Sequence, residues 1–265
     1  MEGNRQMNND IIKKIKQENR NIKIIQISIG ILFILIWEIL SRFKIINSFI
    51  FSSPTKIIKT TIDLFESNNL FNNIYITLYE LFIAFILGSI LGFIIALIFY
   101  KMPILKKIFD PYLTLLNSLP KVALGPLLII WIGANTKSII VMSLLINLIV
   151  SIVGFYNGFI NTDDYKIKLL KSFGAKNNQI LFELVIPSSL DTIFSTLKLN
   201  ISMSLIGVIM GEFLSSKAGI GYLILYGTQV FNLNLVMTGI LLLLILSYLL
   251  YLIINYLEKK MVKKE

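Results

Sequence analysis

The 265-residue sequence contains neither cysteine nor histidine. The absence of cysteine excludes disulfide bonds and thiolate chemistry, and the absence of histidine excludes His-ligated metal sites. The sequence also lacks the GxxxxGK(S/T) loop that binds nucleotide phosphates in many ATPases. The acidic neighbours Asp163 and Asp164 fit helix caps better than a catalytic pair. An enzyme is therefore not indicated, and no cofactor is expected in this chain.

The amino-acid composition is dominated by apolar residues. They make up 55% of the sequence, and the mean hydropathy is +0.77, which is too apolar for an ordinary soluble domain. A bilayer core of about 30 Å needs roughly 20 apolar residues per helix. Six segments approach that length, so we expect an all-α polytopic membrane protein with one transmembrane domain (24–257) between two cytoplasmic tails (1–23 and 258–265). The predicted spans are 24–40, 74–100, 112–132, 138–160, 192–214 and 235–257.

The distribution of basic residues predicts the orientation. With the N-terminus inside, most lysines and arginines fall on the cytoplasmic side, and the opposite side receives only Arg42, Lys44, Lys56, Lys59, Lys137 and Lys217. The positive-inside rule therefore favours both termini in the cytoplasm. The net charge of +10 flanks apolar spans instead of forming one basic domain, which indicates anionic lipid headgroups and no nucleic acid.

Small residues recur every four positions on two of the predicted spans. They are Ala84, Gly88 and Gly92 on the second span, and Gly207 and Gly211 on the fifth. Such stripes let helices approach closely, either within one subunit or between two subunits.

The third span is predicted to be a broken helix, because Pro120 and Pro126 bracket Lys121. Lys121 either lines a transport pathway, where it meets an anionic substrate or pairs with an acid such as Glu212, or anchors the chain at the cytoplasmic interface. Glu38, Glu80 and Glu212 are expected near the outer ends of their spans, within reach of water or headgroups. Glu212 is the best pathway candidate of the three. Lys198 is expected to snorkel to the cytoplasmic interface.

A polar loop at 161–187 separates two apolar spans and carries two helical patterns. Tyr165, Leu169, Leu170 and Phe173 form the first apolar stripe, which we expect to end at Gly174. A second helix is expected to begin within Ala175–Asn178 and to end at Pro187. Its apolar stripe is formed by Ile180, Leu181, Leu184 and Val185. Two short helices around one glycine would present a rigid knob to a soluble partner. The alternative is an ordinary amphipathic helix on the membrane surface.

The 161–187 loop resembles a cytoplasmic motif of binding-protein-dependent ABC importer permeases. That motif reads E-A-A, three residues, Gly, nine residues, an aliphatic, one residue, an aliphatic and Pro; Gly174, Leu184, Ile186 and Pro187 match it. The stretches LPKVALGPLLIIWIG (119–133) and GEFLSSKAGIGYLI (211–224), with Trp37 and Glu38, resemble the nitrate, sulfonate and taurine branch. The chain departs from the motif where Lys168, Leu169 and Leu170 replace Glu-Ala-Ala, and Glu80 stands where related permeases often have a basic residue.

The resemblance implies a type I ABC importer permease fold in a bacterial inner (plasma) membrane. It implies a homodimer working with two cytoplasmic ATPase subunits, which bind ATP and Mg, and with an extracytoplasmic solute-binding protein. The solute would be small: nitrate, a sulfonate, taurine, or a pyrimidine or vitamin precursor. The residues implied in coupling to the ATPase are Lys168, Leu169, Leu170, Phe173, Gly174, Ala175, Leu184, Ile186 and Pro187, and the pathway candidates are Pro120, Lys121, Pro126 and Glu212. The alternative class is a secondary transporter or channel, but the sequence shows no inverted repeat.

Overall fold

The computed structural model describes residues 2–67 and 69–262, and all the regular secondary structure in these residues is helical. Five helices within them are long and apolar enough to cross a membrane. They are α1 (Glu2–Arg42), α4 (Asn69–Lys101), α7 (Thr136–Ile160), α11 (Leu190–Ser215) and α13 (Leu233–Val262). The helices α1 and α13 run through the boundaries predicted for the two tails.

A bent pair of segments gives a sixth span if its two parts are counted as one. The helix α5 (Pro103–Ser118) is followed by a 3-10 turn, η1 (Lys121–Leu124), and by α6 (Gly125–Ile132), with an angle of 84° between the two parts. The predicted break at Pro120 is therefore confirmed. The predicted start of this span at residue 112 is wrong, because α5 begins at Pro103 and continues through Pro111.

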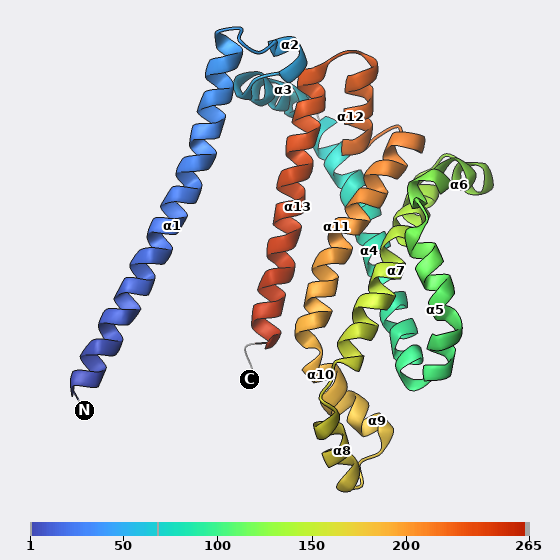
Figure 1. The fold of residues 1–265 in the computed structure, drawn as a ribbon. Helices are drawn as coiled ribbons and strands as arrows, with labels where there is room; N and C mark the ends of the chain where they lie inside the picture. Colours follow the sequence, from blue (N-terminus) through green and yellow to red (C-terminus); the bar gives the residue numbers. More distant parts are fainter. Residues whose placement is uncertain (1, 68, 263–265) are drawn as a thin grey trace.

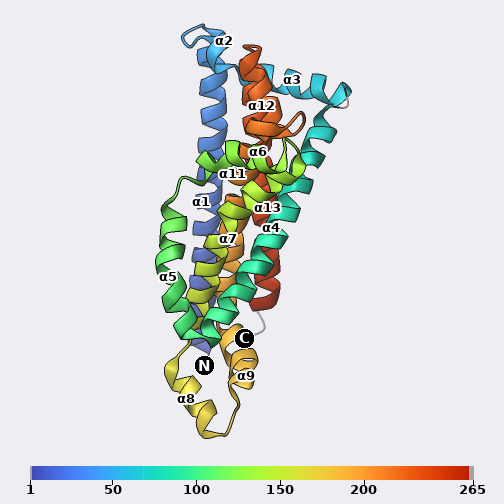
Figure 2. The same cartoon turned by 90° about the vertical axis from the view of Figure 1, so that its right-hand side faces the viewer.

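The shorter helices lie at the two ends of the long ones. Figures 1 and 2 show α2 (Ser48–Phe51), α3 (Pro54–Glu66) and α12 (Ile220–Gln229) at the upper end. At the lower end, α8 (Asp164–Ser172) and α9 (Asn177–Ile180) project beyond the long helices. The last turns of α13 and the start of α1 also lie at this lower end (Figure 1).

The centre of the subunit is the contact of α4, α7 and α11. Gly88 faces Asn147, and Gly92 and Gly207 face serines of α7 so closely that an added Cβ would overlap them. Gly211 likewise lies against Ile139, and Ala84 is completely buried. In this structure the small residues of both stripes therefore lie in helix contacts within one subunit.

Polar side chains join the same three helices. Asn147 Nδ2 donates to the backbone oxygen of Ala84 at 3.0 Å and to Ser204 Oγ at 2.5 Å. One turn further along, Asn200 Nδ2 donates to Ser151 Oγ at 2.5 Å. Because a polar group inside the bilayer has no water to bind, these bonds favour one particular packing of the three helices.

Candidate coupling and transport sites

The 161–187 loop folds into two short helices around a glycine, as predicted. Asp163 caps α8 by accepting a hydrogen bond from the backbone N–H of Tyr165 at 2.8 Å. Gly174 ends the first helix. Its φ is +84°, a backbone conformation that is strained for any residue other than glycine. The second helix begins at Asn177.

The second helix does not stop at Pro187, contrary to expectation. A π-helical turn, η2 (Leu181–Val185), follows α9, and Pro187 lies in the first turn of α10 (Ile186–Ser188). A first-turn proline loses no helical hydrogen bond, because the N–H groups there have no partner within the helix. The chain then continues into α11 at Leu190.

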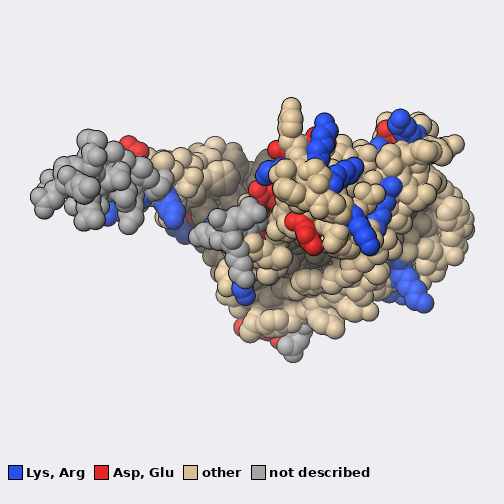
Figure 3. All heavy atoms as spheres, turned by 90° about the horizontal axis from the view of Figure 1, so that it is seen from below, with Lys and Arg blue, Asp and Glu red and all other residues tan. Residues whose placement is uncertain are grey.

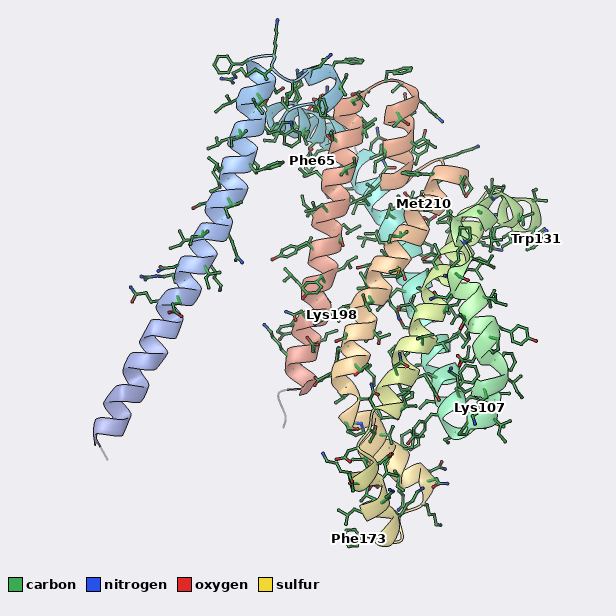
Figure 4. All side chains as sticks on the ribbon, viewed as in Figure 1. Phe65, Lys107, Trp131, Phe173, Lys198 and Met210 are labelled. Atoms are coloured by element: carbon green, nitrogen blue, oxygen red, sulfur yellow. The ribbon has the colours of Figure 1, made fainter. Side chains whose placement is uncertain are left out.

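The apolar residues of α8 point in two directions. Ile167 and Leu170 pack against a buried cluster made of Phe155, Phe159, Ile180, Leu181, Val185 and Ala96, as do Ala175, Leu184 and Ile186. Tyr165, Leu169 and Phe173 face outward and are 82%, 54% and 77% exposed. Figure 4 shows Phe173 at the lower tip of the molecule. The single stripe expected from the sequence is therefore divided, and Leu170 belongs to the inner face.

Basic side chains surround the outward face. Lys166, Lys168 and Lys171 are exposed on α8, and Lys176 is exposed just before α9. The ammonium of Lys168 lies 5.8 Å from the ring centre of Tyr165. In the part of the chain that the structure describes, no carboxylate forms an ion pair with these lysines. Figure 3 views the molecule from this end and shows basic side chains on its surface.

Glu212 lies in a buried junction at the opposite end, where α11 turns into α12. Water or headgroups were expected to solvate Glu80 and Glu212, but both are completely buried. The two oxygens of Glu212 accept hydrogen bonds from Thr77 Oγ1 at 2.6 Å and from the backbone N–H of Gly221 at 2.5 Å. Neither oxygen of Glu80 accepts a hydrogen bond from the described residues.

Two glycines make room for the Glu212 carboxylate. Gly219 has a φ of +112°, and a Cβ at Gly219 or at Gly221 would overlap that carboxylate. The helix α4 holds the same turn from the other side, because Asn73 Oδ1 accepts from Gly219 N at 2.6 Å and Thr77 Oγ1 accepts from Ile220 N at 2.8 Å. A carboxylate at the first turn of α12 is also favoured by the helix dipole. The glycines and the glutamate of the 211–224 stretch therefore form one structural unit with α4.

Lys121 lies in η1, at the end of α5 that is further from α8 (Figure 1). This position argues against a cytoplasmic anchor, because α8 marks the predicted cytoplasmic end. The Lys121 ammonium donates to the backbone oxygen and the side-chain oxygen of Asn117 at 3.3 and 3.4 Å. The expected alternative of a pair with Glu212 is not formed. Pro120 and Pro126 flank Lys121 on the exposed surface of this bend.

The other ionisable candidates have local partners. Glu38 of α1 accepts hydrogen bonds from the hydroxyl and the backbone N–H of Thr55, which joins α1 to α3. Lys198, which is expected to snorkel to the cytoplasmic interface, also forms an ion pair of 2.6 Å with Glu258 of α13. Its ammonium also lies 5.5 Å from the ring centre of Tyr251.

Comparison with known proteins places this chain in a family. The sequence model described as "Binding-protein-dependent transport system inner membrane component" matches residues 88–263, which include the 161–187 loop and the Glu212 junction. The chain belongs to this family. It is the multi-pass permease subunit of an ABC importer for a small solute, and ATP hydrolysis takes place in a separate subunit of the complex.

Curated relatives agree with this assignment. A "Probable ABC transporter permease protein" of Haemophilus influenzae is 28% identical, over 86% of this chain and 92% of the relative. The "Formylaminopyrimidine transport permease protein ThiX" of Halalkalibacterium halodurans is 28% identical, over 72% and 76%. A "Putative aliphatic sulfonates transport permease protein SsuC" of Bacillus subtilis is 25% identical, over 87% and 83%.

A solved structure shows the same fold. The inward-facing MetNI methionine ABC transporter matches with a TM-score of 0.62 over 71% of this chain and 92% of the matched chain. At 19% identity this likeness concerns the fold alone. The predicted fold of an ABC importer permease is confirmed.

Sequence reasoning missed the role of Asn73 and Thr77 in the Glu212 junction. Together with Glu80, these residues occur at intervals of four and three on α4 and therefore share one face of the helix. Polar residues repeated at that spacing in an apolar span could have indicated a buried polar contact.

Proposed function

We propose that the chain works as a homodimer with two copies of a cytoplasmic ATPase and one extracytoplasmic solute-binding protein. The ATPases would hold ATP and Mg. The exposed 161–187 loop carries this proposal, since it projects two short helices, anchored to the subunit by Leu170 and its neighbours, toward the side of both chain ends. In this arrangement both termini lie in the cytoplasm of a bacterial cell, and residues 24–257 form the permease domain.

The proposed coupling is mechanical. Movement of the ATPases on ATP binding would shift α8, and the inner contacts of Leu170, Ala175, Leu184 and Ile186 would transmit that shift to α7 and α11. Lys168, Leu169 and Phe173 would contact the ATPase directly, while Gly174 and Pro187 fix the shape of the loop.

The proposed pathway runs beside the bend between α5 and α6. Pro120 and Pro126 hold this segment out of a regular helix, and Lys121 offers a cation to the solute. We assign Glu212 a supporting role behind the pathway, because its carboxylate is engaged by Thr77 and Gly221 and is not exposed. The solute would be a nitrate-like, sulfonate-like or taurine-like anion, or a pyrimidine or vitamin precursor.

The test begins with affinity purification of the tagged chain from its native membrane in mild detergent. An ATPase with a phosphate loop should be recovered in equal amount, and a solute-binding protein recovered with it would identify the solute. Uptake and ATP hydrolysis are then measured in proteoliposomes with Gly174→Val. No atom would clash with a side chain at Gly174, but the positive φ is unfavourable for valine, so the substitution should distort the loop. A distorted loop should not transmit the movement of the ATPases, so hydrolysis should continue while uptake falls at least tenfold.

Gly30→Val is the matched control, because no heavy atom lies within 4 Å of a Cβ at that position and the backbone is helical. Full coupling in Gly174→Val, or recovery of the chain without any ATPase, would count against the proposal.

A further inference from the structure

The outward face of α8 combines two properties that together specify its partner. Tyr165, Leu169 and Phe173 occur at intervals of four, so they form one exposed apolar stripe along the helix. Exposed aromatic side chains of this kind are typical anchors of protein interfaces. The stripe is not needed for packing within the subunit, because Ile167 and Leu170 fill that role from the other face.

Lysines outnumber carboxylates beside this stripe. Lys166, Lys168, Lys171 and Lys176 are all exposed. Of the three acidic residues in 161–187, Asp163 and Asp164 lie before or at the first residue of α8. Glu183 lies in η2, on a separate turn of the loop. An apolar surface edged by an excess of lysines that form no ion pair within the described residues favours an acidic partner over a basic one. Charges at the rim of an interface mainly control which partner approaches and how fast.

We propose that the ATPase surface that receives α8 is an apolar groove edged by carboxylates. This inference rests on the proposed function and goes further, since it states the charge that the partner must carry. The replacement of Glu-Ala-Ala by Lys168, Leu169 and Leu170 is then explained in two parts. Lys168 reverses the charge presented to the ATPase, whereas Leu170 enlarges the contact inside the permease.

An anionic membrane surface is the other partner that would attract such lysines. The arrangement favours the ATPase, because α8 and α9 project beyond the ends of the long helices, and Phe173 lies at the outermost tip (Figure 4). A helix that binds the membrane surface would instead lie along the headgroups with its aromatic side chains turned toward the lipid.

The experiment measures binding of the recovered ATPase to the full-length permease in nanodiscs of zwitterionic lipid at increasing NaCl. Wild-type affinity should fall as salt rises, because salt screens charges at the rim of the contact. The double substitution Lys168→Glu with Lys171→Glu should weaken binding at least tenfold at low salt and abolish the decrease with salt. Exchange of groove carboxylates on the ATPase for lysine should restore affinity to this variant.

A matched double substitution, Lys259→Glu with Lys260→Glu, changes the charge equally at the exposed end of α13 and should leave binding unchanged. The variants must elute from size-exclusion chromatography as the wild type does, and Lys168→Gln, which changes less, should weaken binding about threefold. The inference is overturned if the α8 double variant binds as tightly as wild type, or if it differs only in nanodiscs of anionic lipid. Failure of the wild-type chain to bind any ATPase would instead reject the proposed function itself.

Discussion

The two ends of this permease use polar residues in opposite ways. At the junction of α4, α11 and α12, Glu212 is completely buried, and its oxygens accept hydrogen bonds from Thr77 and Gly221. In the 161–187 loop, the lysines are exposed, and no carboxylate of the described chain pairs with them. Buried polar groups with hydrogen-bond partners fix a structure, whereas the exposed apolar side chains between these lysines mark an interaction surface. Substitutions at the first end should therefore reduce stability, and substitutions at the second should reduce coupling.

The largest expected loss of stability is at Gly219. In Gly219→Val the new side chain would meet the Glu212 carboxylate and force a β-branched residue into a positive φ. We expect a loss of about 3 kcal/mol or more from strain together with broken buried hydrogen bonds. Membrane expression and thermal unfolding in detergent measure this effect. Gly30→Val is the control, and equal stability of the two variants would show that the junction is not rigid.

Thr77→Val should have the next largest effect. The substitution keeps the shape of the side chain but removes the donor to Glu212 and the acceptor for the N–H of Ile220. Buried groups left without partners cost about 1–3 kcal/mol, so the unfolding temperature should fall measurably. In the control Thr114→Val, the exposed hydroxyl bonds only to the backbone oxygen of Asp110 within its own helix, and stability should be nearly unchanged. A similar loss in both variants would contradict the special role of Thr77.

Lys198→Met should have a smaller effect. It breaks the ion pair with Glu258, whose side chain is about one-fifth exposed like that of Lys198, so water can partly replace the lost partner. We expect a loss of about 1.5 kcal/mol. Limited proteolysis near the end of α13 and thermal unfolding both report on this contact. Lys198→Arg keeps the charge and should stay within about 0.5 kcal/mol of wild type; unchanged behaviour of Lys198→Met would mean that the pair contributes nothing.

Much of the fold could be predicted from composition and spacing. The long apolar segments, the break at Pro120 and the turn at Gly174 depend on local chemistry, which a single sequence displays directly. Pro187 misleads a prediction from sequence, because it lies in the first turn of α10 directly after a π turn, where a proline loses no helical hydrogen bond. Pro111 also lies inside α5 without ending it, although an internal proline breaks most helices.

The sites depended on contacts between distant residues. Thr77 and Glu212 are 135 positions apart, so the burial of that carboxylate is not evident from the sequence near either residue. The two faces of α8 present the same problem on a smaller scale. Leu169 and Leu170 are neighbours in sequence, but successive helical residues point about 100° apart. Only the position of the bundle determines which of the two is turned inward.

Single-cysteine crosslinking tests the central claim most directly, because the natural chain has no cysteine to interfere. Leu169→Cys and Leu170→Cys are compared in membranes that contain the ATPase, with a short thiol-to-amine crosslinker and detection of the joined subunits. We predict a strong crosslink to the ATPase from position 169 and little or none from position 170, whose side chain packs inside the permease. Equal crosslinking from both positions, or none from position 169, would contradict the assignment of the outward face of α8 to the ATPase.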